Sequence, residues 1–397
     1  MKSNITKGRT GWFAPCVVLA LALTACGGGN VSPAPLDPRL STVLDDLLLH
    51  ALDPLAPGRG RPDYPDVAQA DIPKADAMVL KAGLMRGATP DLVAMASRSL
   101  QRLQDSADAD GDGVVGWGLP FAWDAFGDGT TNPGGTVYAI STAIVIDALL
   151  DQGALQGGAP RDALARQSLA ALQPFMDPTR KTPGGLPPYS LTPQDRSWDV
   201  FNTAVYLAAM AQRLSLEPAL AAQAASLRDW ADQVMEVMAQ RHLTSADGAW
   251  YWPYLLPGSS VNDLPHAGYM IYGVETYIRN GGRRESAFDR PALWRHLREF
   301  LVDGEAWVRA YPNFLPSGPA RLYDIGFVLL TLCQLPNEET AVRDAVLNHM
   351  PQYRLASGHY AKYPVGLPVA QPLPVEVITE YETYLLAGTA ACRAAGR

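Results

Sequence analysis

The sequence lacks the marks of several common protein classes. Only 18% of its 397 residues are charged and 48% are hydrophobic, which excludes a disordered chain, because disorder requires high charge and few apolar residues. After the first 25 residues, no run of 18 apolar residues suits a membrane-spanning helix. Cys-x-x-Cys, His-Glu-x-x-His, Gly-x-Ser-x-Gly and phosphate-binding glycine motifs are also missing, so zinc, serine-hydrolase and nucleotide chemistry have no support.

Aromatic residues, glycine and proline are instead abundant. The chain holds nine Trp, nine Phe and sixteen Tyr, which indicates a packed globular body large enough for one or two domains. Its 33 Pro and 35 Gly exceed the usual share, and both residues weaken helix interiors. We therefore expect them in turns and loops.

Residues 1–25 are typical of a secretory signal, with a basic start and an apolar stretch too short to cross a bilayer. The stretch ends in Leu23-Thr24-Ala25-Cys26, which resembles the lipobox of bacterial lipoproteins. The resemblance implies cleavage before Cys26 and lipidation of that cysteine; an ordinary signal with an incidental cysteine is the alternative. Residues 26–38 would then carry the lipid and a flexible tether. Gly27 in place of Asp implies the outer membrane, with the protein facing the periplasm or the cell exterior.

Removal of the signal changes the charge and the cysteine count. The formal net charge falls from −8 to −11, which leaves no electrostatic footprint for nucleic acid, and the lipid anchor is the one membrane contact we predict. Besides Cys26, only Cys333 and Cys392 remain. We expect buried free thiols there, although the periplasm would permit a disulfide.

From residue 39 onward the apolar pattern is helical and recurs in pairs with a period of about 60 residues. The first member of a pair is nearly apolar all round, and the second is amphipathic. A helix of the first kind must be buried on every face, whereas the second kind lines an exterior. The predicted helices are 40–49, 75–84, 90–103, 138–150, 161–175, 198–214, 218–239, 265–278, 291–302, 322–335, 339–349 and 377–393.

An inner ring of buried helices inside an outer amphipathic ring satisfies this alternation. The pattern resembles the α/α toroid, the six-hairpin barrel of many carbohydrate-active enzymes, and the resemblance covers residues 39–397 as one all-α domain. A straight helical solenoid is the structural alternative, but its usual repeat of about 34 residues is much shorter. The segment 249–252 is the one candidate for a short strand.

The long loops before the inner helices are rich in aromatic residues, and in a ring of antiparallel hairpins they all fall on one face. Aromatic rings offer flat apolar surface to a sugar, so we predict a carbohydrate cleft; rings that simply pack over the opening are the alternative. The predicted substrate-binding residues are Trp117, Trp123, Tyr189, Trp198, Trp250, Trp252, Tyr269, Arg321 and Tyr381.

Polar residues also gather where the inner helices begin, although a cap or helix-dipole role is the ordinary alternative for each. A glycosidase needs two carboxyl groups flanking the bond, whereas a uronate lyase or epimerase uses Tyr or His with an Arg. The stretch Leu322-Tyr323-Asp324-Ile325-Gly326 weakly resembles the helical domain of glucuronyl epimerases, which implies uronic-acid substrates. The predicted catalytic residues are Asp199, His266, Tyr323, Asp324 and Glu380.

One local motif predicts a metal. Asp108, Asp110 and Asp112, followed by Gly113, match the front half of an EF-hand loop, so we expect a structural Ca²⁺ there and no cofactor required for catalysis. The twelfth position is Leu119 rather than Glu, so Asp124 or Asp128 would have to complete the site. A solvated acidic turn is the alternative.

Together these patterns predict a membrane-anchored protein that cleaves or modifies a polysaccharide or oligosaccharide, as a glycoside hydrolase, a polysaccharide lyase or a uronyl epimerase. Two alternatives stay open. One is a non-catalytic glycan-binding or polysaccharide-export lipoprotein, which needs only the aromatic cleft. The other is a helical scaffold for protein partners, which needs a broad apolar surface.

Overall fold

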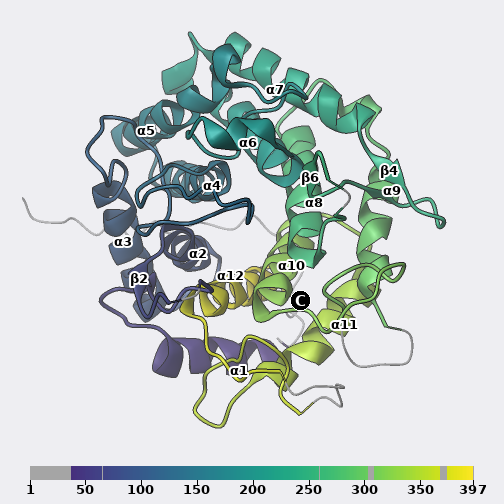
Figure 1. The fold of residues 1–397 in the computed structure, drawn as a ribbon. Helices are drawn as coiled ribbons and strands as arrows, with labels where there is room; N and C mark the ends of the chain where they lie inside the picture. Colours follow the sequence, from purple (N-terminus) through teal and green to yellow (C-terminus); the bar gives the residue numbers. More distant parts are fainter. Residues whose placement is uncertain (1–36, 65, 259, 303–307, 367–372, 397) are drawn as a thin grey trace, which may run out of the picture. The chain divides into compact units, whose positions relative to one another are not determined.

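The described part of the chain contains twelve α-helices arranged as an inner and an outer ring (Figure 1). The structure is a computed structural model, and it describes residues 37–64, 66–258, 260–302, 308–366 and 373–396. The inner helices are α2 (Pro73–Leu84), α4 (Ala139–Gln156), α6 (Phe201–Leu214), α8 (Leu264–Arg279), α10 (Leu322–Gln334) and α12 (Thr379–Ala394). The outer helices are α1 (Pro38–Asp46), α3 (Pro90–Asp105), α5 (Gly158–Met176), α7 (Ala224–Gln240), α9 (Arg290–Arg295) and α11 (Thr340–His349).

The inner ring closes on itself. Each inner helix packs against the next inner helix in chain order, and α12 packs against α2. The outer helix α1 packs on α12, so the first and last helices of the described chain form the sixth hairpin. This arrangement confirms the predicted α/α toroid.

Burial explains the two helix types. Every residue of α4 from Ala139 to Leu150 is buried, because the helix meets neighbours in the ring on both sides and α5 behind it. Helix α5 instead buries one face, which includes Leu164, Leu169 and Leu172, and exposes the other. The apolar and amphipathic patterns of the sequence thus follow from position in the two rings.

Helices α10 and α12 approach most closely at two facing glycines. A Cβ on Gly388 would lie 2.3 Å from the carbonyl oxygen of Gly326, so neither position has room for a side chain. Near the other end of the same helix pair, Cys333 and Cys392 form a disulfide. The expectation of free thiols is therefore wrong, because close packing of two helices that are distant in sequence brings the two sulfur atoms together.

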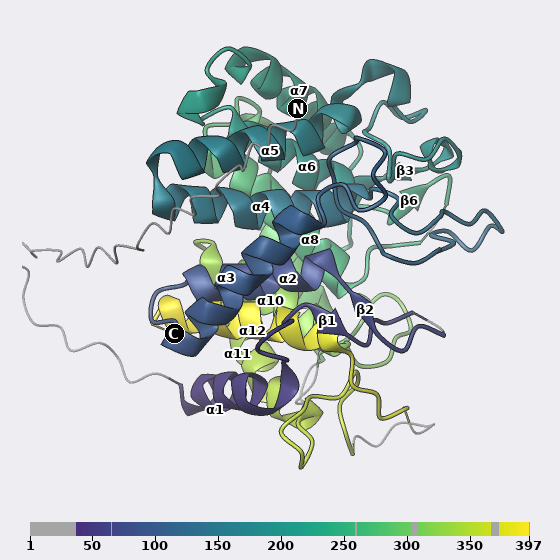
Figure 2. The ribbon, with the colours of Figure 1, turned by 90° about the vertical axis from the view of Figure 1, so that its left-hand side faces the viewer.

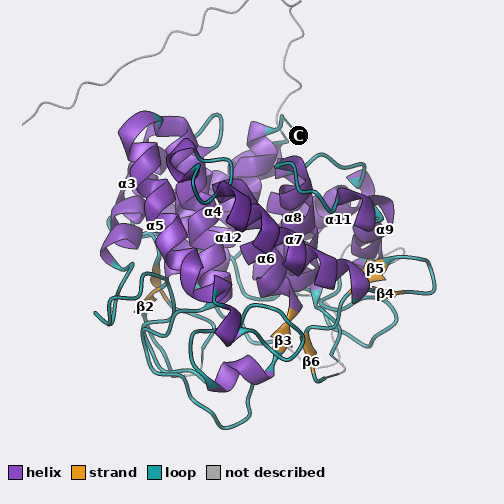
Figure 3. Ribbon diagram, turned by 90° about the horizontal axis from the view of Figure 1, so that it is seen from above, coloured by secondary structure: helices purple, strands orange, loops and turns teal. Residues whose placement is uncertain are grey.

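Within the described residues, six two-residue strands form three antiparallel pairs outside the helices. They are β1 (Arg59–Gly60) with β2 (Ala70–Asp71), β3 (Asp199–Val200) with β6 (Leu255–Leu256), and β4 (Leu243–Thr244) with β5 (Trp250–Tyr251). The long loops lie on one face, at the N-terminal ends of the inner helices (Figures 2 and 3). The long loops therefore cover that face of the ring, as their lengths in the sequence predict.

Three predicted helix boundaries are wrong. Residues 198–200 do not start a helix, because Asp199 and Val200 pair with β6 and α6 begins at Phe201. Helix α7 begins at Ala224, after a short 3₁₀ turn at Pro218–Leu220, and α9 gives way to a 3₁₀ segment at His296–Phe300. Among the described residues, no helix is both long and apolar enough to cross a membrane. The predicted signal, Cys26 and residues 27–36 of the predicted tether lie outside the described residues, and α1 begins at Pro38, the last residue assigned to the tether.

Candidate active site

A cavity of about 230 Å³ opens at the N-terminal ends of the inner helices. All six inner helices contribute to it from their first turns, because their N-termini share one face of the ring. The positive ends of six helix dipoles point toward this region. The contributing residues are Lys74, Ile140, Ser141, Asn202, His266, Tyr269, Tyr323, Glu380 and Tyr381.

Aromatic side chains form one wall of the cavity. The ring of Trp123 lies 5.3 Å from Tyr64, 5.5 Å from Tyr138 and 6.3 Å from Tyr189, measured between centroids. Tyr254 lines the cavity beside His266, with 4.7 Å between their rings. Most of these rings come from loops that precede inner helices, so the aromatic loops do reach the cavity.

His266 belongs to a charged network at the start of α8. Its Nδ1 contacts the carboxylate of Asp263, the N-cap residue of the helix, and the other oxygen of Asp263 accepts from Arg321 at 2.7 Å. Arg321 also pairs with Asp324 at 3.0 Å. Because Asp263 occupies Nδ1, it fixes the orientation of the imidazole and leaves Nε2 toward the cavity.

The pKa values of this network follow its geometry. Burial opposes ionisation of Asp263, but His266 and Arg321 outweigh burial and hold the pKa of Asp263 below its ordinary value. Asp324 is fully buried, and burial together with the charge of Asp263 raises the pKa of Asp324 above its ordinary value although Arg321 opposes the shift. Asp263 is thus the carboxylate that stays ionised beside Arg321 and His266.

Glu380 and Lys74 form a second charged pair, on the neighbouring helices α12 and α2. The Nζ of Lys74 lies 2.7 Å from Oε1 of Glu380, and the carboxylate is almost fully buried. In the order of the inner ring, α2 lies three positions from α8 and α12 lies two, so Lys74 reaches the cavity from the helix opposite that of His266, and Glu380 reaches it from the helix beside α2. A third pair, Lys362 with Asp63 at 2.5 Å, lies at the rim, where Asp63 also accepts from Tyr381.

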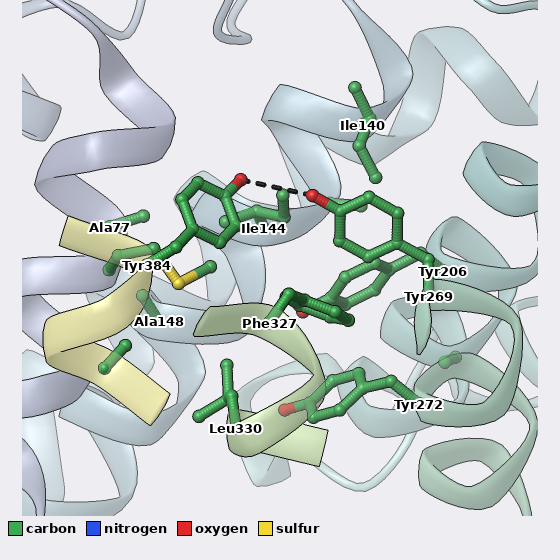
Figure 4. Close-up of a cluster of buried hydrophobic side chains, with 14 of the residues drawn as sticks. Ala77, Ile140, Ile144, Ala148, Tyr206, Tyr269, Tyr272, Phe327, Leu330 and Tyr384 are labelled. Carbon is green, nitrogen blue, oxygen red and sulfur yellow. Dashed lines mark hydrogen bonds between the residues drawn. The ribbon is translucent and has the colours of Figure 1, made fainter. Parts of the chain in front are cut away.

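Three tyrosine hydroxyls meet where Tyr269 and Tyr323 line the cavity. Tyr269 contacts the hydroxyl of Tyr323 and lies 3.2 Å from that of Tyr384; Figure 4 shows the second contact among the buried residues of the ring. Burial raises the pKa of all three phenols above the ordinary value. They therefore stay protonated and suit hydrogen-bond donation or proton delivery rather than proton abstraction.

Several neutral polar groups of the cavity have no internal partner. The Oδ1 atom of Asn202 is buried without a hydrogen bond to any described residue, and Asn202 as a whole is 2% exposed. The hydroxyl of Ser141 and Nε2 of His266 likewise make no hydrogen bond within the described part of the chain. Buried polar groups are nearly always paired in folded proteins, so the buried oxygen of Asn202 points to a polar ligand, and the hydroxyl of Ser141 and the partly exposed imidazole of His266 are available to the same ligand.

A second, wider cavity of about 590 Å³ adjoins the first. Asp63 and Tyr64 line both cavities, and the second is otherwise bordered by residues such as Arg61, Asp66 and Glu376. Together the two cavities offer space for a ligand longer than one sugar ring along the loop-bearing face.

The cavity brings together eight of the residues that the sequence singles out. They are His266, Tyr323, Glu380, Trp123, Tyr189, Tyr269, Arg321 and Tyr381. It does not include Asp199, Asp324, Trp117, Trp198, Trp250 and Trp252.

The two predicted carboxylates outside the cavity have structural partners. Asp199 pairs with Arg241 at 2.8 Å and accepts from the backbone of Gly184, because it lies in a strand rather than in a first helical turn. Asp324 caps α10 by accepting from the backbone nitrogen of Arg321 at 2.7 Å. Through these contacts both carboxylates stabilise the fold.

The four tryptophans outside the cavity belong to the core or to loop packing. The indoles of Trp117 and Trp252 are buried and donate to backbone carbonyls in the outer helices α3 and α7. Trp250 stacks on His242, and Trp198 stacks on Phe126. An aromatic loop residue in the sequence does not reveal which way its ring turns.

Sequence reasoning missed several cavity residues, among them Asp63, Lys74, Asn202, Tyr254 and the adjoining Asp263. A signal existed for two of them: Lys74 and Asn202 are the second residues of inner helices, as is Glu380. Asp263 stands three residues before His266 with Leu and Pro between them, a helix-start pattern that fixes their contact. Asp63 and Tyr254 come from loops, where the sequence does not show which way a side chain points.

The predicted calcium loop is partly assembled. One oxygen from each of Asp108, Asp110 and Asp112 lies within 4.8 Å of the others, and all three residues are exposed. Asp124 does not complete the set, because its carboxylate accepts from the backbone of residues 126–129. Asp128 instead binds Thr130. Three exposed carboxylates fall short of the six to eight oxygens that Ca²⁺ takes, so calcium here stays a prediction.

Comparison with known proteins gives a fold and no family. No family model matches the chain, and no match was found among curated proteins. Solved structures do match over nearly the whole chain. A family 76 glycoside hydrolase (mannosidase) from Bacteroides thetaiotaomicron has a TM-score of 0.60 at 12% identity, over 90% of this chain and 97% of that one.

Two further structures show the same architecture. Cellobiose 2-epimerase from Bacillus thermoamylovorans has a TM-score of 0.58 at 9% identity, over 90% of this chain and 99% of that one. An unsaturated glucuronyl hydrolase specific for heparin has a TM-score of 0.51 at 11% identity, over 89% and 96%. At these identities the similarity establishes the α/α toroid fold.

Proposed function

We propose that this protein is a glycan-modifying enzyme that works by general acid–base catalysis in the cavity at the N-terminal ends of the inner helices. The observation that carries the proposal is the meeting of two oriented proton-transfer groups, His266 and Glu380, with unpartnered neutral groups and an aromatic wall. Solved structures of the same fold include glycoside hydrolases and a sugar epimerase, which supports the same class of substrate.

His266 is the proposed base. A carboxylate on Nδ1 holds the imidazole in the tautomer whose Nε2 accepts a proton, and it stabilises the imidazolium that results. Glu380 lines the same cavity from α12, two helices along the inner ring from His266, with Lys74 compensating its charge. The phenol of Tyr323 supplies a proton donor between them.

This arrangement favours proton transfer at a sugar carbon next to a carbonyl group, as in an epimerase. Such a reaction needs a base on one face of the sugar, a donor on the other, and hydrogen bonds to the developing oxyanion. In the order of the ring Lys74 stands opposite His266 and Glu380 lies on the neighbouring α12, and the NH₂ group of the Asn202 side chain can donate to the oxygen.

Hydrolysis is the second candidate, because two carboxylates, Asp63 and Glu380, line the same cavity. A glycosidase requires one of its two carboxyl groups to be protonated. Here each carboxyl group already binds a lysine, Glu380 with Lys74 at 2.7 Å and Asp63 with Lys362 at 2.5 Å, whereas Nε2 of His266 makes no hydrogen bond within the described part of the chain. Proton transfer by His266 therefore accounts for more of the site than a carboxylic-acid pair does.

We also propose that the enzyme is exported and held on the outer membrane by a lipid on Cys26. The lipobox-like sequence supports this location. The disulfide between Cys333 and Cys392 agrees with it, since disulfides persist in the oxidising periplasm.

The test is a panel of polysaccharides and oligosaccharides incubated with the full chain in D₂O. Deuterium on a sugar carbon supports an epimerase, new reducing ends support a hydrolase, and unsaturated uronates support a lyase. Replacement of His266 by Asn should abolish the signal. The variant His242→Asn is the control, because His242 stacks on Trp250 outside the cavity. Binding without any reaction would contradict an enzyme and favour a glycan-binding protein.

A further inference from the structure

The charged and the neutral groups of the cavity differ in one respect. Each cation that lines it already has a carboxylate partner: Lys74 has Glu380 at 2.7 Å, and Arg321 has both Asp263 at 2.7 Å and Asp324 at 3.0 Å. The groups that lack internal partners, on Asn202, Ser141 and His266, are a neutral amide, a hydroxyl and an imidazole nitrogen.

A bound carboxylate would therefore meet no unpaired cation. It would instead enter a site where Asp63, Asp263 and Glu380 are already present. Like charges at short range in a partly dehydrated cavity repel strongly, and partial burial weakens solvent screening. Sugar hydroxyls, in contrast, match the unpartnered amide and hydroxyl and stack on Trp123.

We propose that the cavity selects an uncharged sugar, and that Asp263 is the residue that determines this specificity. The proposal deepens the glycan-modifying function proposed above and rests on it. Asp263 uses one oxygen to orient His266 and the other to neutralise Arg321. Without the carboxylate of Asp263, Arg321 would keep Asp324 as its one remaining partner, and the Nη2 group that Asp263 now accepts from would be open to a uronate carboxylate.

The experiment measures binding of a matched pair of ligands to the full chain. One member is an oligogalacturonide and the other is the same oligosaccharide after carboxyl reduction, so linkage and configuration are identical. Trp123 lines the cavity, so intrinsic tryptophan fluorescence reports binding. We expect the neutral member to bind at least tenfold more tightly, and the same order for oligoglucuronides and their reduced forms.

The variant Asp263→Asn tests the residue directly. It should bind the uronate member at least fivefold more tightly than the natural protein does, and the preference for the neutral member should shrink or reverse. The variant Glu380→Gln leaves Lys74 without its partner and should shift the preference in the same direction, which keeps the proposal testable if the first variant does not fold. Asp199→Asn is the matched control, because Asp199 pairs with Arg241 outside the cavity.

The outcomes separate this inference from the function on which it rests. Tighter binding of the uronate member by the natural protein would overturn the inference and leave a glycan-active site in place. An unchanged preference in both cavity variants would overturn the role of Asp263. Failure of every neutral and charged glycan to bind or react would contradict the proposed function itself, and with it this inference.

Discussion

The two ends of the inner ring both carry polar side chains, but they use them differently. Toward the C-terminal ends of the inner helices, the buried ammonium of Lys81 donates to Asp147 and Asp151, each at 2.7 Å. Arg213 contacts the same two carboxylates, and Tyr206 donates to Asp147 at 3.0 Å. At the N-terminal ends, charges are also paired, but the buried oxygen of Asn202 beside the cavity has no partner among the described residues.

The difference separates structural from functional polarity. A buried charge cluster whose members satisfy one another stabilises packing and has nothing left to offer a ligand. Burial opposes ionisation of Asp147, yet Lys81 and Arg213 outweigh burial and lower the pKa of Asp147 below its ordinary value. The buried oxygen of Asn202, which has no partner among the described residues, can instead accept a hydrogen bond from a ligand.

The largest expected effect concerns catalysis at the N-terminal end. Replacement of His266 by Asn should lower the rate of the reaction found in the glycan panel by about a hundred- to ten-thousand-fold, because the proposed proton acceptor is lost. The free energy of unfolding should change by less than about 1 kcal/mol, since the imidazole is partly exposed. Rate assays and thermal unfolding check the two halves. A loss of stability without a loss of rate would show that His266 is a structural residue, and it would contradict the distinction between a functional and a structural end of the ring.

The next effect concerns stability at the C-terminal end. Replacement of Asp147 by Asn should destabilise the protein by about 3–5 kcal/mol, because it leaves the buried Lys81 and Arg213 with a single carboxylate between them. Denaturant unfolding measures this loss. Asp151→Asn is the matched control and should cost less, because Asp151 is 24% exposed. Equal losses in the two variants would contradict the central role of Asp147.

A smaller effect depends on pH and lies on the outer side of α12. Burial raises the pKa of Glu382 to about 7, although Tyr360 and His359 oppose the shift. The folded state therefore binds the proton of the Glu382 carboxyl group more tightly than the unfolded state does. The stability that this protonation contributes is lost as the pH rises from about 4.5 to 7.

The variant Glu382→Gln imitates the protonated acid. It should match the natural protein at pH 4.5 and exceed its free energy of unfolding by roughly 2–3 kcal/mol at pH 8. Thermal unfolding across this pH range provides the measurement. A variant that is less stable at pH 8 would show that the ionised carboxylate is a favourable partner.

The smallest effect sharpens the contrast between paired and unpaired groups. Replacement of Asn202 by Ala should change stability by less than about 1 kcal/mol, because its buried oxygen has no hydrogen bond to lose. It should weaken glycan binding by about tenfold, which corresponds to one lost hydrogen bond with the ligand. Fluorescence titration measures the affinity. Unchanged affinity would remove Asn202 from the proposed binding site.

Much of the fold could be predicted from the sequence because burial leaves a direct pattern. A helix such as α10, apolar on every face, has to lie inside, and an amphipathic helix such as α5 has to lie outside. Irregular starts were harder to predict: Asp199 stands at the edge of an apolar helical run, but the strand β6, more than 50 residues later, draws it into a sheet.

The candidate site likewise contains residues that could be predicted from the sequence and residues that could not. His266, Tyr323 and Glu380 could be chosen because they stand in the first turns of inner helices, whose positions the periodicity gives. Trp117 and Trp252 appear just as suitable in sequence but turn into the core, because their indoles find backbone acceptors in neighbouring outer helices. Asp263 was missed because its importance lies in its contact with Arg321, 58 residues away.

The sequence by itself determined that helices alternate between buried and amphipathic, that the loops on one face carry the aromatic residues, and that polar groups start the inner helices. These features follow from local periodicity and composition. Only the tertiary structure decided which side chains face the cavity, that Cys333 is bonded to Cys392, and that the cations already have partners. Pairing and direction depend on contacts between helices far apart in the chain, and no local pattern encodes those distances.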